Sequence, residues 1–157
     1  MYNLGGGCSA TEQIFVNKSV ACYACLVNFA CLDDALYGDT NNECEDVPGA
    51  ATGGDQVGVS NATLCLEKIN CVMTTSCAST DVASCYCGSF EGTACATQSQ
   101  PADGRCAALE AEGVNHFPSD PASVVSPLLG NRNSAAGKGD AIFSCSVING
   151  CSPLCNQ

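Results

Sequence analysis

Cys22-Tyr-Ala-Cys25-Leu-Val-Asn-Phe-Ala-Cys31 is the stretch that bears most on the fold, because its cysteines lie within a helical pattern. Apolar residues recur around it at spacings of three, four and seven, which is typical of one face of a helix. The sequence therefore predicts a long first helix from about residue 10 to residue 37, opened by a capping box of Ser9 and Glu12. The apolar face comprises Phe15, Cys22, Cys25, Phe29, Leu32 and Leu36.

The spacing of these cysteines also limits how they bond. Six residues turn a helix by about 240°, so Cys25 and Cys31 point to different sides and cannot bond each other. Each must therefore reach another segment. The same spacing occurs at Cys25–Cys31, Cys65–Cys71, Cys71–Cys77 and Cys145–Cys151.

Cysteine usage places the protein in an oxidising compartment. The chain of 157 residues contains 15 cysteines but only one Cys-x-x-Cys pair and one histidine, too few for the usual structural zinc sites. The pattern predicts about seven disulfides and an extracellular or cell-surface location. The structural disulfide candidates are Cys22, Cys25, Cys31, Cys44, Cys65, Cys71, Cys77, Cys85, Cys87, Cys95, Cys106, Cys145, Cys151 and Cys155.

Because the number of cysteines is odd, seven bridges leave one over. Cys8 is the candidate, since it follows Gly5, Gly6 and Gly7 in a glycine-rich N-terminal arm, residues 1–9, that we expect to be flexible. An unpaired cysteine in a secreted chain indicates a free thiol or a bond between subunits. The alternative, in which Cys8 pairs internally and another cysteine stays reduced, is left open.

Composition excludes several classes of partner. The chain has 5 Lys+Arg against 16 Asp+Glu, a formal net charge of −11. We expect no nucleic-acid binding, because neutralising phosphates needs clustered cations. No apolar run approaches the roughly 18–20 residues of a spanning helix, so we expect no membrane span.

The remaining sequence predicts a mainly α fold, a small disulfide-rich helical domain over residues 10–157 with long loops. An acidic and then glycine-rich loop covers residues 38–60, in which residues 56–60 are the one strand candidate. Start and stop signals indicate the other helices. These are expected at about residues 61–74, 81–87, 103–112, 120–130 and 134–149.

Few residues suggest chemistry. His116 is the only histidine that could activate a nucleophile, and we expect that the protein is not an enzyme. Cys22 and Cys25 have the spacing of a redox pair, but their place within a helix favours structural bonds to other segments.

Calcium is the only cofactor considered, and the candidate loop lacks the turn glycine of calcium-binding loops. Two Asn-x-Ser/Thr sequons make Asn17 and Asn61 candidates for glycosylation. The calcium ligands would be Asp39, Asn41, Glu43 and Glu45.

The C-terminal cysteine motifs occur in a distinctive order. The motifs, in order, are Cys71-Val-Met-Thr-Thr-Ser-Cys77, Cys85-Tyr-Cys-Gly88, Cys106-Ala-Ala-Leu-Glu-Ala-Glu112, Ala135-Ala-Gly-Lys-Gly-Asp-Ala141, and the final cysteines Cys145, Cys151 and Cys155. Over roughly residues 65–157, this order resembles that of uncharacterised cysteine-rich exported proteins of the delta-proteobacterial, myxobacterial type. The resemblance implies a surface or secreted location and carries no known reaction.

Seven bridges exceed what a domain of this length needs to fold, which favours durability outside the cell. The sequence predicts an extracellular structural protein, a self-assembling subunit of a filament, sheath or surface layer whose partners are copies of itself. One alternative is a monomeric secreted module that binds a small apolar ligand between the first helix and Met73. Another is a metal or electron carrier that uses thiolates.

Overall fold

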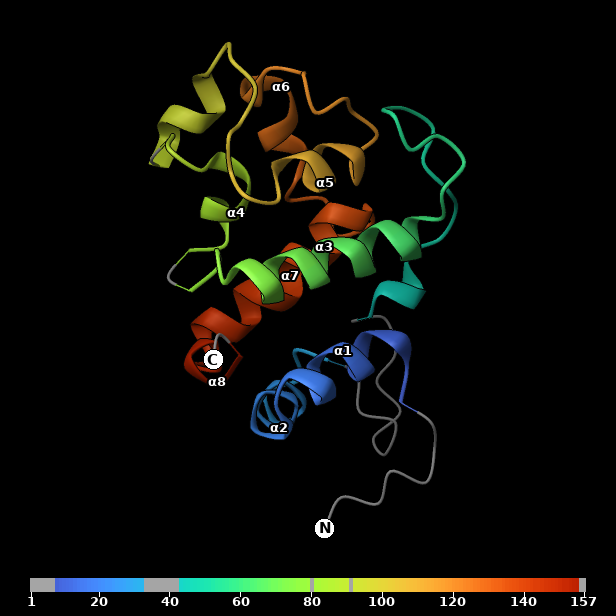
Figure 1. Ribbon diagram of the computed structural model, residues 1–157, viewed down its shortest axis with the longest axis vertical. Helices are drawn as coiled ribbons and strands as arrows, with labels where there is room; N and C mark the ends of the chain where they lie inside the picture. The colour runs from blue at the N-terminus through green and yellow to red at the C-terminus, as the bar shows by residue number, and fades with distance from the viewer. Residues whose placement is uncertain (1–7, 33–42, 80, 91, 156–157) are drawn as a thin grey trace.

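The computed structural model describes residues 8–32, 43–79, 81–90 and 92–155, and there the chain is mainly helical (Figure 1). The predicted mainly α, disulfide-rich fold is therefore confirmed. None of the described helices is long and apolar enough to cross a membrane. The α-helices are α1 (Ala10–Lys18), α2 (Val20–Asn28), α3 (Asn61–Thr75), α4 (Ala83–Cys87), α5 (Ala107–Glu112), α6 (Ala122–Val125), α7 (Ala135–Ile148) and α8 (Ser152–Cys155), and the 3-10 helices are η1 (Cys44–Asp46), η2 (Gly92–Thr97) and η3 (Ser126–Leu128).

The central pair of helices is α3 and α7, which pack against each other. Figure 1 shows α1, α2 and α8 on one side of this pair and α4, α5 and α6 on the other. The main core lies between α1, α2, α3 and α7, where the rings of Phe15 and Phe143 are 6.0 Å apart between centroids. A smaller core surrounds Tyr86 and Val125. The central pair thus separates two apolar clusters.

The first helix is not continuous to residue 37, and this part of the prediction was wrong. Ser19 has an extended backbone, with φ −165° and ψ 125°, and separates α1 from α2. Its hydroxyl accepts from the N–H of Cys22 and so caps α2, while its own N–H donates to the carbonyl of Phe15. A serine that serves both helix ends stabilises a break that the apolar periodicity does not reveal.

The start of the first helix agrees with its predicted capping box. Ser9 accepts from the N–H of Glu12, whose carboxylate accepts from the N–H of Ser9. The chain after α2 is described as far as Leu32, and the predicted face residue Leu36 and the predicted end near residue 37 lie outside the described residues.

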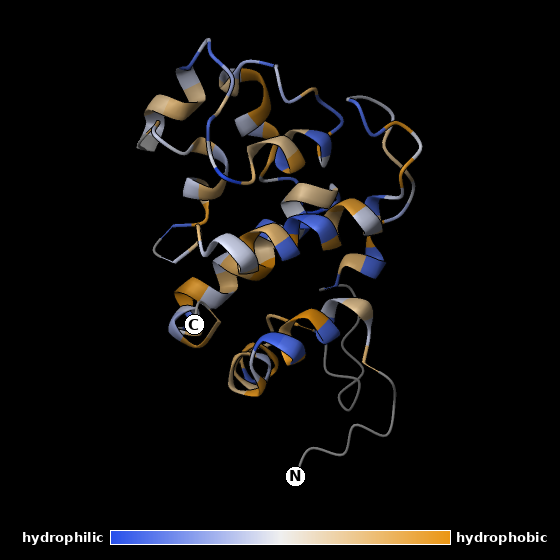
Figure 2. Cartoon of the chain, viewed as in Figure 1, coloured by the Kyte–Doolittle hydropathy of each residue, from blue (hydrophilic) through white to orange (hydrophobic). Residues whose placement is uncertain are grey.

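The two central helices lie where the sequence predicts them. Ser60 caps α3 through the N–H of Thr63, and Ser134 caps α7 through the N–H of Gly137. Figure 2 shows hydrophilic and hydrophobic residues interspersed along α3, as expected for a helix buried on one side. Gly137 is required in the first turn of α7, because a Cβ there would lie 2.1 Å from the carbonyl oxygen of Asn131.

Three helices are shorter than predicted, for local reasons. α5 begins at Ala107 rather than near residue 103, because the N–H groups of Gly104 and Cys106 donate to carbonyls at the end of α4. α6 changes to the 3-10 helix η3 at Ser126, because the following Pro127 has no N–H with which to continue the helix. α4 begins at Ala83, whose N–H donates to the Asp81 carboxylate.

The glycine-rich part of the loop is fastened to α5. Both carboxylate oxygens of Glu112 accept N–H groups from this loop, those of Asp55 at 2.9 Å and Gln56 at 3.0 Å. Gly54 lies against the same carboxylate with a φ of +76°, a conformation and a closeness that favour glycine. The predicted strand at 56–60 is reduced to a single antiparallel bridge between Ala50 and Ser60.

Candidate functional site

Three disulfides join the first helices to the C-terminal end of the chain. Cys22 pairs with Cys155 across 133 residues, Cys25 with Cys151 across 126, and Cys31 with Cys145 across 114. The three loops are nested, so the bridges form a ladder from α2 to α7 and α8. We call these three bridges the terminal ladder. The Cys22–Cys25 pair is therefore structural, as predicted.

Four further disulfides hold the middle of the chain. None of them joins cysteines of a Cys-x5-Cys motif to each other, in agreement with the helical argument, and Cys85 and Cys87 have separate partners. These bridges are Cys44–Cys65, Cys71–Cys106, Cys77–Cys85 and Cys87–Cys95.

Cys8 is the cysteine without a disulfide partner. It is half-buried and directly precedes the cap of α1. The adjoining glycines of the predicted arm, Gly5, Gly6 and Gly7, lie outside the described residues. The structure thus assigns the odd thiol to the cysteine that the sequence indicated, while its role between subunits stays a prediction.

The sulfurs of Cys77, Cys85 and Cys106 form the one potential metal-ligand cluster found among the described residues, all within 4.8 Å of one another. All three are disulfide-bonded, and the Sγ atoms of Cys77 and Cys106, from different bridges, are 3.7 Å apart. Metals bind cysteine as the thiolate. The cluster in its bonded form is therefore a contact between two bridges and not a ligand set.

The two described calcium candidates act as helix caps. Glu45 accepts from the N–H of Thr11 at 3.0 Å and from its hydroxyl at 2.5 Å, which fixes the start of α1. Glu43 forms a capping box with Asp46 around η1. The other two candidates, Asp39 and Asn41, lie outside the described residues, so calcium binding stays a prediction.

The glycosylation candidates differ in their surroundings. Asn17 is exposed on α1, where its side-chain oxygen accepts from Gln13. The Asn61 amide instead donates to the carbonyl of Pro48 at 2.7 Å, so a sugar on this nitrogen would remove that bond. Modification of either asparagine stays a prediction, and Asn17 is the more accessible of the two.

The single histidine lies in a local turn. His116 Nδ1 is 2.8 Å from a carboxylate oxygen of Asp120, which also accepts from the N–H of Phe117. Two hydrogen bonds hold the pKa of Asp120 below its ordinary value. The bond from His116 has the larger effect and the bond from the N–H of Phe117 the smaller one. These contacts hold the His116 ring within the turn.

A buried charge cluster that we did not predict from the sequence lies between the two central helices and α5. Lys68 of α3 and Glu110 of α5 are 0% and 1% exposed, and the Asp140 side chain of α7 is 18% exposed. Lys68 Nζ contacts Asp140 Oδ1 directly, donates to the carbonyl of Ala136 at 2.8 Å, and lies 3.6 Å from Glu110 Oε2. We call Lys68, Glu110 and Asp140 the buried triad.

Burial shifts the pKa of both acids of the buried triad. It raises the pKa of Glu110 to about 8, against the opposing effect of the Lys68 charge, and it raises the pKa of Asp140 above its ordinary value. The Oε1 atom of Glu110 makes no hydrogen bond to any residue that the structure describes. Lys68 thus faces two carboxyl groups whose pKa values burial raises above the ordinary ones.

A faint signal of the buried triad is present in the sequence. Lys68 stands three residues after Cys65 and four before Val72, which places it on the inner face of α3. Gly139 leaves space for the lysine, since a Cβ there would lie 3.0 Å from Lys68 Cδ. Nothing in the pattern indicates that Glu110 and Asp140 would meet this side chain.

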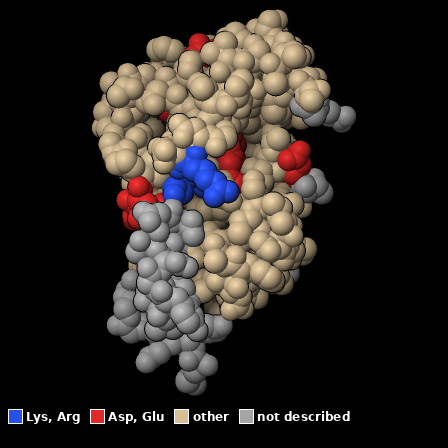
Figure 3. Space-filling view, turned by 180° about the vertical axis from the view of Figure 1, so that it is seen from behind, with Lys and Arg blue, Asp and Glu red and all other residues tan. Residues whose placement is uncertain are grey.

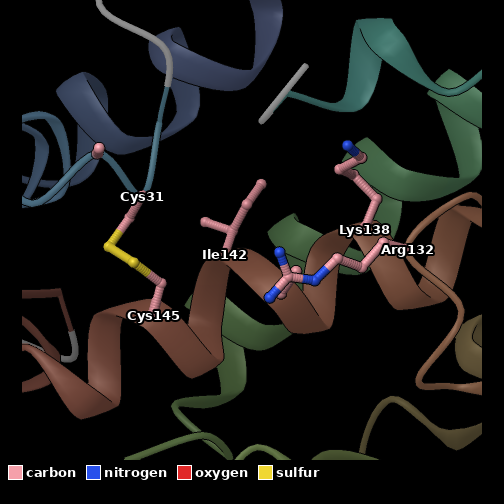
Figure 4. A pocket seen from close by; sticks show the side chains of 7 residues that line it. Cys31, Arg132, Lys138, Ile142 and Cys145 are labelled. Carbon is pink, nitrogen blue, oxygen red and sulfur yellow. A yellow bond between two sulfur atoms is a disulfide. The ribbon is translucent and has the colours of Figure 1, made fainter. Parts of the chain in front are cut away.

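A small cavity beside the terminal ladder carries positive charge. Figure 3 shows basic side chains gathered in one place on the face opposite to Figure 1, with acidic side chains beside them. In Figure 4, Arg132 and Lys138 lie along a cavity of about 160 Å³ that also borders Ile142 and the Cys31–Cys145 bridge. Two cations together are notable in a chain that has 5 Lys+Arg.

Comparison with known proteins identifies no relative. No protein-family model, curated protein sequence or solved structure matches this chain.

Proposed function

We propose that the protein is an extracellular structural protein whose copies assemble into a filament, sheath or surface layer stabilised by disulfides. The observation that carries this proposal is the distribution of sulfur. Seven bridges use fourteen cysteines within the chain and leave Cys8 as the unpaired thiol. Disulfides are typical of secreted proteins, and a leftover thiol favours a bond between chains.

The terminal ladder supports a mechanical role. It joins α2 and the turn after it covalently to α7 and α8, although the bonded cysteines are more than 100 positions apart. A subunit of this kind keeps its shape while its neighbours are added, because the bridges restrict the unfolded chain. Copies that meet through unlike surfaces form an open fibre when their rotation does not close.

Exposed apolar side chains at the ends of α2 and α7 offer a noncovalent contact between copies. Phe29 is 52% exposed and Ile148 is 81% exposed. They lie near the same bridge, since Cys145 Sγ is 3.9 Å from the carbonyl of Phe29 and Ile148 is one turn further along α7. Burying such side chains against a second copy is favourable and offsets repulsion between acidic chains.

The covalent part of the proposal is tested by non-reducing electrophoresis of the purified protein and of a Cys8→Ser variant. We expect a ladder of oligomers that collapses when thiol is added, and a monomer band for the variant. A wild-type protein that migrates as a monomer at every concentration contradicts the role of Cys8.

The noncovalent part is tested by light scattering and electron microscopy at increasing salt. Ile148→Asp should prevent growth of particles, whereas Val57→Asp, at a residue that is 64% exposed in the loop before α3, should leave it unchanged. Salt should promote growth because it screens repulsion between chains of the same charge. Absence of particles from the wild-type protein under all conditions would overturn the proposal.

The alternative function, a carrier of a small apolar ligand, gains no support from the position of Met73. Met73, which a carrier of small apolar ligands would place at a cavity, is 4% exposed and packs in the main core. Native mass spectrometry provides the direct check, because a carrier would retain a bound molecule whereas a structural subunit would show the mass of the chain alone.

A further inference from the structure

We propose that Lys68 and Asp140 become joined by an intramolecular isopeptide bond, with Glu110 as the group that transfers protons during its formation. The inference goes beyond the proposed function and does not depend on it, because the bond would form within a single chain. It rests on the geometry of the buried triad, in which an amine, the carboxyl group that it would attack and a second carboxyl group meet inside the protein.

Position is the first requirement, and the fold meets it. Lys68 Nζ is in direct contact with Asp140 Oδ1, and its donation to the carbonyl of Ala136 helps to hold it there. Gly139 lets the lysine pass close to α7, because a Cβ at this position would make a tight contact with Lys68 Cδ. Two groups held in contact on packed helices react intramolecularly. Their effective concentration is therefore higher by orders of magnitude than that of the same groups free in solution.

Protonation is the second requirement, since the lysine must be neutral to act as a nucleophile. Moving one proton from the Lys68 ammonium to the Asp140 carboxylate removes both charges. Such a transfer is costly in water but much less so where both groups are shielded from solvent. Burial already raises the pKa of Asp140, and it keeps Glu110 protonated up to about pH 8.

The reaction needs no oxidant or other reactant. The Lys68 nitrogen attacks the carboxyl carbon of Asp140 and forms a C–N bond, giving a tetrahedral intermediate. Glu110 donates its proton to the departing hydroxyl group and takes up a proton from the nitrogen, so that it ends in its starting state. The C–O bond breaks, one water leaves, and an ammonium and a carboxylate have become a neutral amide.

Glu110 is placed for this proton transfer. Its Oε2 atom is 3.6 Å from Lys68 Nζ, and its Oε1 atom has no hydrogen-bond partner among the described residues. A buried carboxyl group without a full set of partners costs stability, so its presence calls for an explanation. A role in forming the amide explains why an acid, and not an apolar residue, occupies this position.

The test is the mass of the protein after full reduction and alkylation, which removes any effect of the disulfides. Loss of one water lowers the mass by about 18 Da relative to the sequence, a shift that is easily resolved for a small protein. Proteolytic digestion followed by tandem mass spectrometry should then recover one species that contains both Lys68 and Asp140. A wild-type chain at its full sequence mass would overturn the proposal.

Variants distinguish the isopeptide bond from other reactions that remove one water from the chain. Lys68→Arg and Glu110→Gln should both retain the full mass, whereas Glu112→Gln, a second buried acid on the same helix, should still lose water. Asp103-Gly104 is a site where an aspartate can cyclise, so a loss of water that maps there counts against the proposal. A Glu110→Gln variant that still forms the amide refutes the role of Glu110.

Discussion

The nested bridges of the terminal ladder allow a quantitative prediction of stability. Each bridge shortens the loop that the others close, so each one restricts the unfolded chain less than it would alone. Taken alone, Cys25–Cys151 closes a loop of 126 residues, and loop entropy would then assign it about 5 kcal/mol. Yet Cys22–Cys155 already brings these segments together. Only three positions separate Cys22 from Cys25, and four separate Cys151 from Cys155, so the additional loop is short.

The structure provides a matched bridge for comparison. Cys71–Cys106 spans 35 residues and is not enclosed by a larger bridge that lies close to both of its ends. Each pair has one half-buried cysteine and one that is at most 2% exposed, so the packing lost on substitution is similar. The bridges Cys77–Cys85 and Cys87–Cys95 lie inside the Cys71–Cys106 loop and shorten its path to about 20 residues. Loop entropy then gives about 3.3 kcal/mol for Cys71–Cys106, against about 2.5 kcal/mol for Cys25–Cys151 within the ladder.

The assay is guanidinium unfolding without reductant, on the double variants Cys25→Ala/Cys151→Ala and Cys71→Ala/Cys106→Ala. Both should be made in a Cys8→Ser background, so that no free thiol exchanges with the bridges. We expect the second variant to lose more of the free energy of unfolding than the first, by about 0.8 kcal/mol. An equal or larger loss for Cys25→Ala/Cys151→Ala would refute the entropic reasoning.

Three further predictions concern single side chains. Thr11→Val should lower the free energy of unfolding by about 1–3 kcal/mol, measured by denaturant titration, because the buried N–H of Cys44 loses the hydroxyl that it donates to at 3.0 Å. Gly137→Ala should lower the melting temperature although alanine favours helices, whereas Gly130→Ala, with no atom within 4 Å of its added Cβ, should not. Stability should fall as pH rises from 4.5 to about 8, because the pKa of Glu110 is higher in the fold than in the unfolded chain. This pH dependence should be weaker in Glu110→Gln, and an unchanged pH profile in that variant would exclude Glu110 as its source.

The sequence predicted helices best where their ends are marked by local chemistry. Ser9, Ser60 and Ser134 each cap a helix close to its expected start, because the bond they make depends only on residues a few positions away. The break at Ser19 escaped prediction for a related reason. A serine within an apolar pattern is compatible with a continuous helix, and the choice of a break depends on what the two short helices pack against.

Cysteine spacing predicted which pairs could not form, but not which would. The helical argument excluded bonds within the Cys-x5-Cys motifs, whereas the terminal ladder depends on contacts across more than 100 residues. The buried triad shows the same limit, because Lys68, Glu110 and Asp140 come from three helices that meet only in the folded chain. Local pattern reveals an inward-facing lysine, and tertiary structure supplies its partners.

The outermost disulfide of the terminal ladder, Cys22–Cys155, determines which residues would bear a pulling force applied to the chain. Residues 23–154 lie inside the loop that this bridge closes. Tension applied at the two ends of the chain would cross from one to the other through a single sulfur–sulfur bond, and the enclosed helices would bear none of it. Residues before Cys22, which include α1, would carry the load and could extend, whereas residues 23–154 should stay folded under it until the bridges of the terminal ladder are reduced.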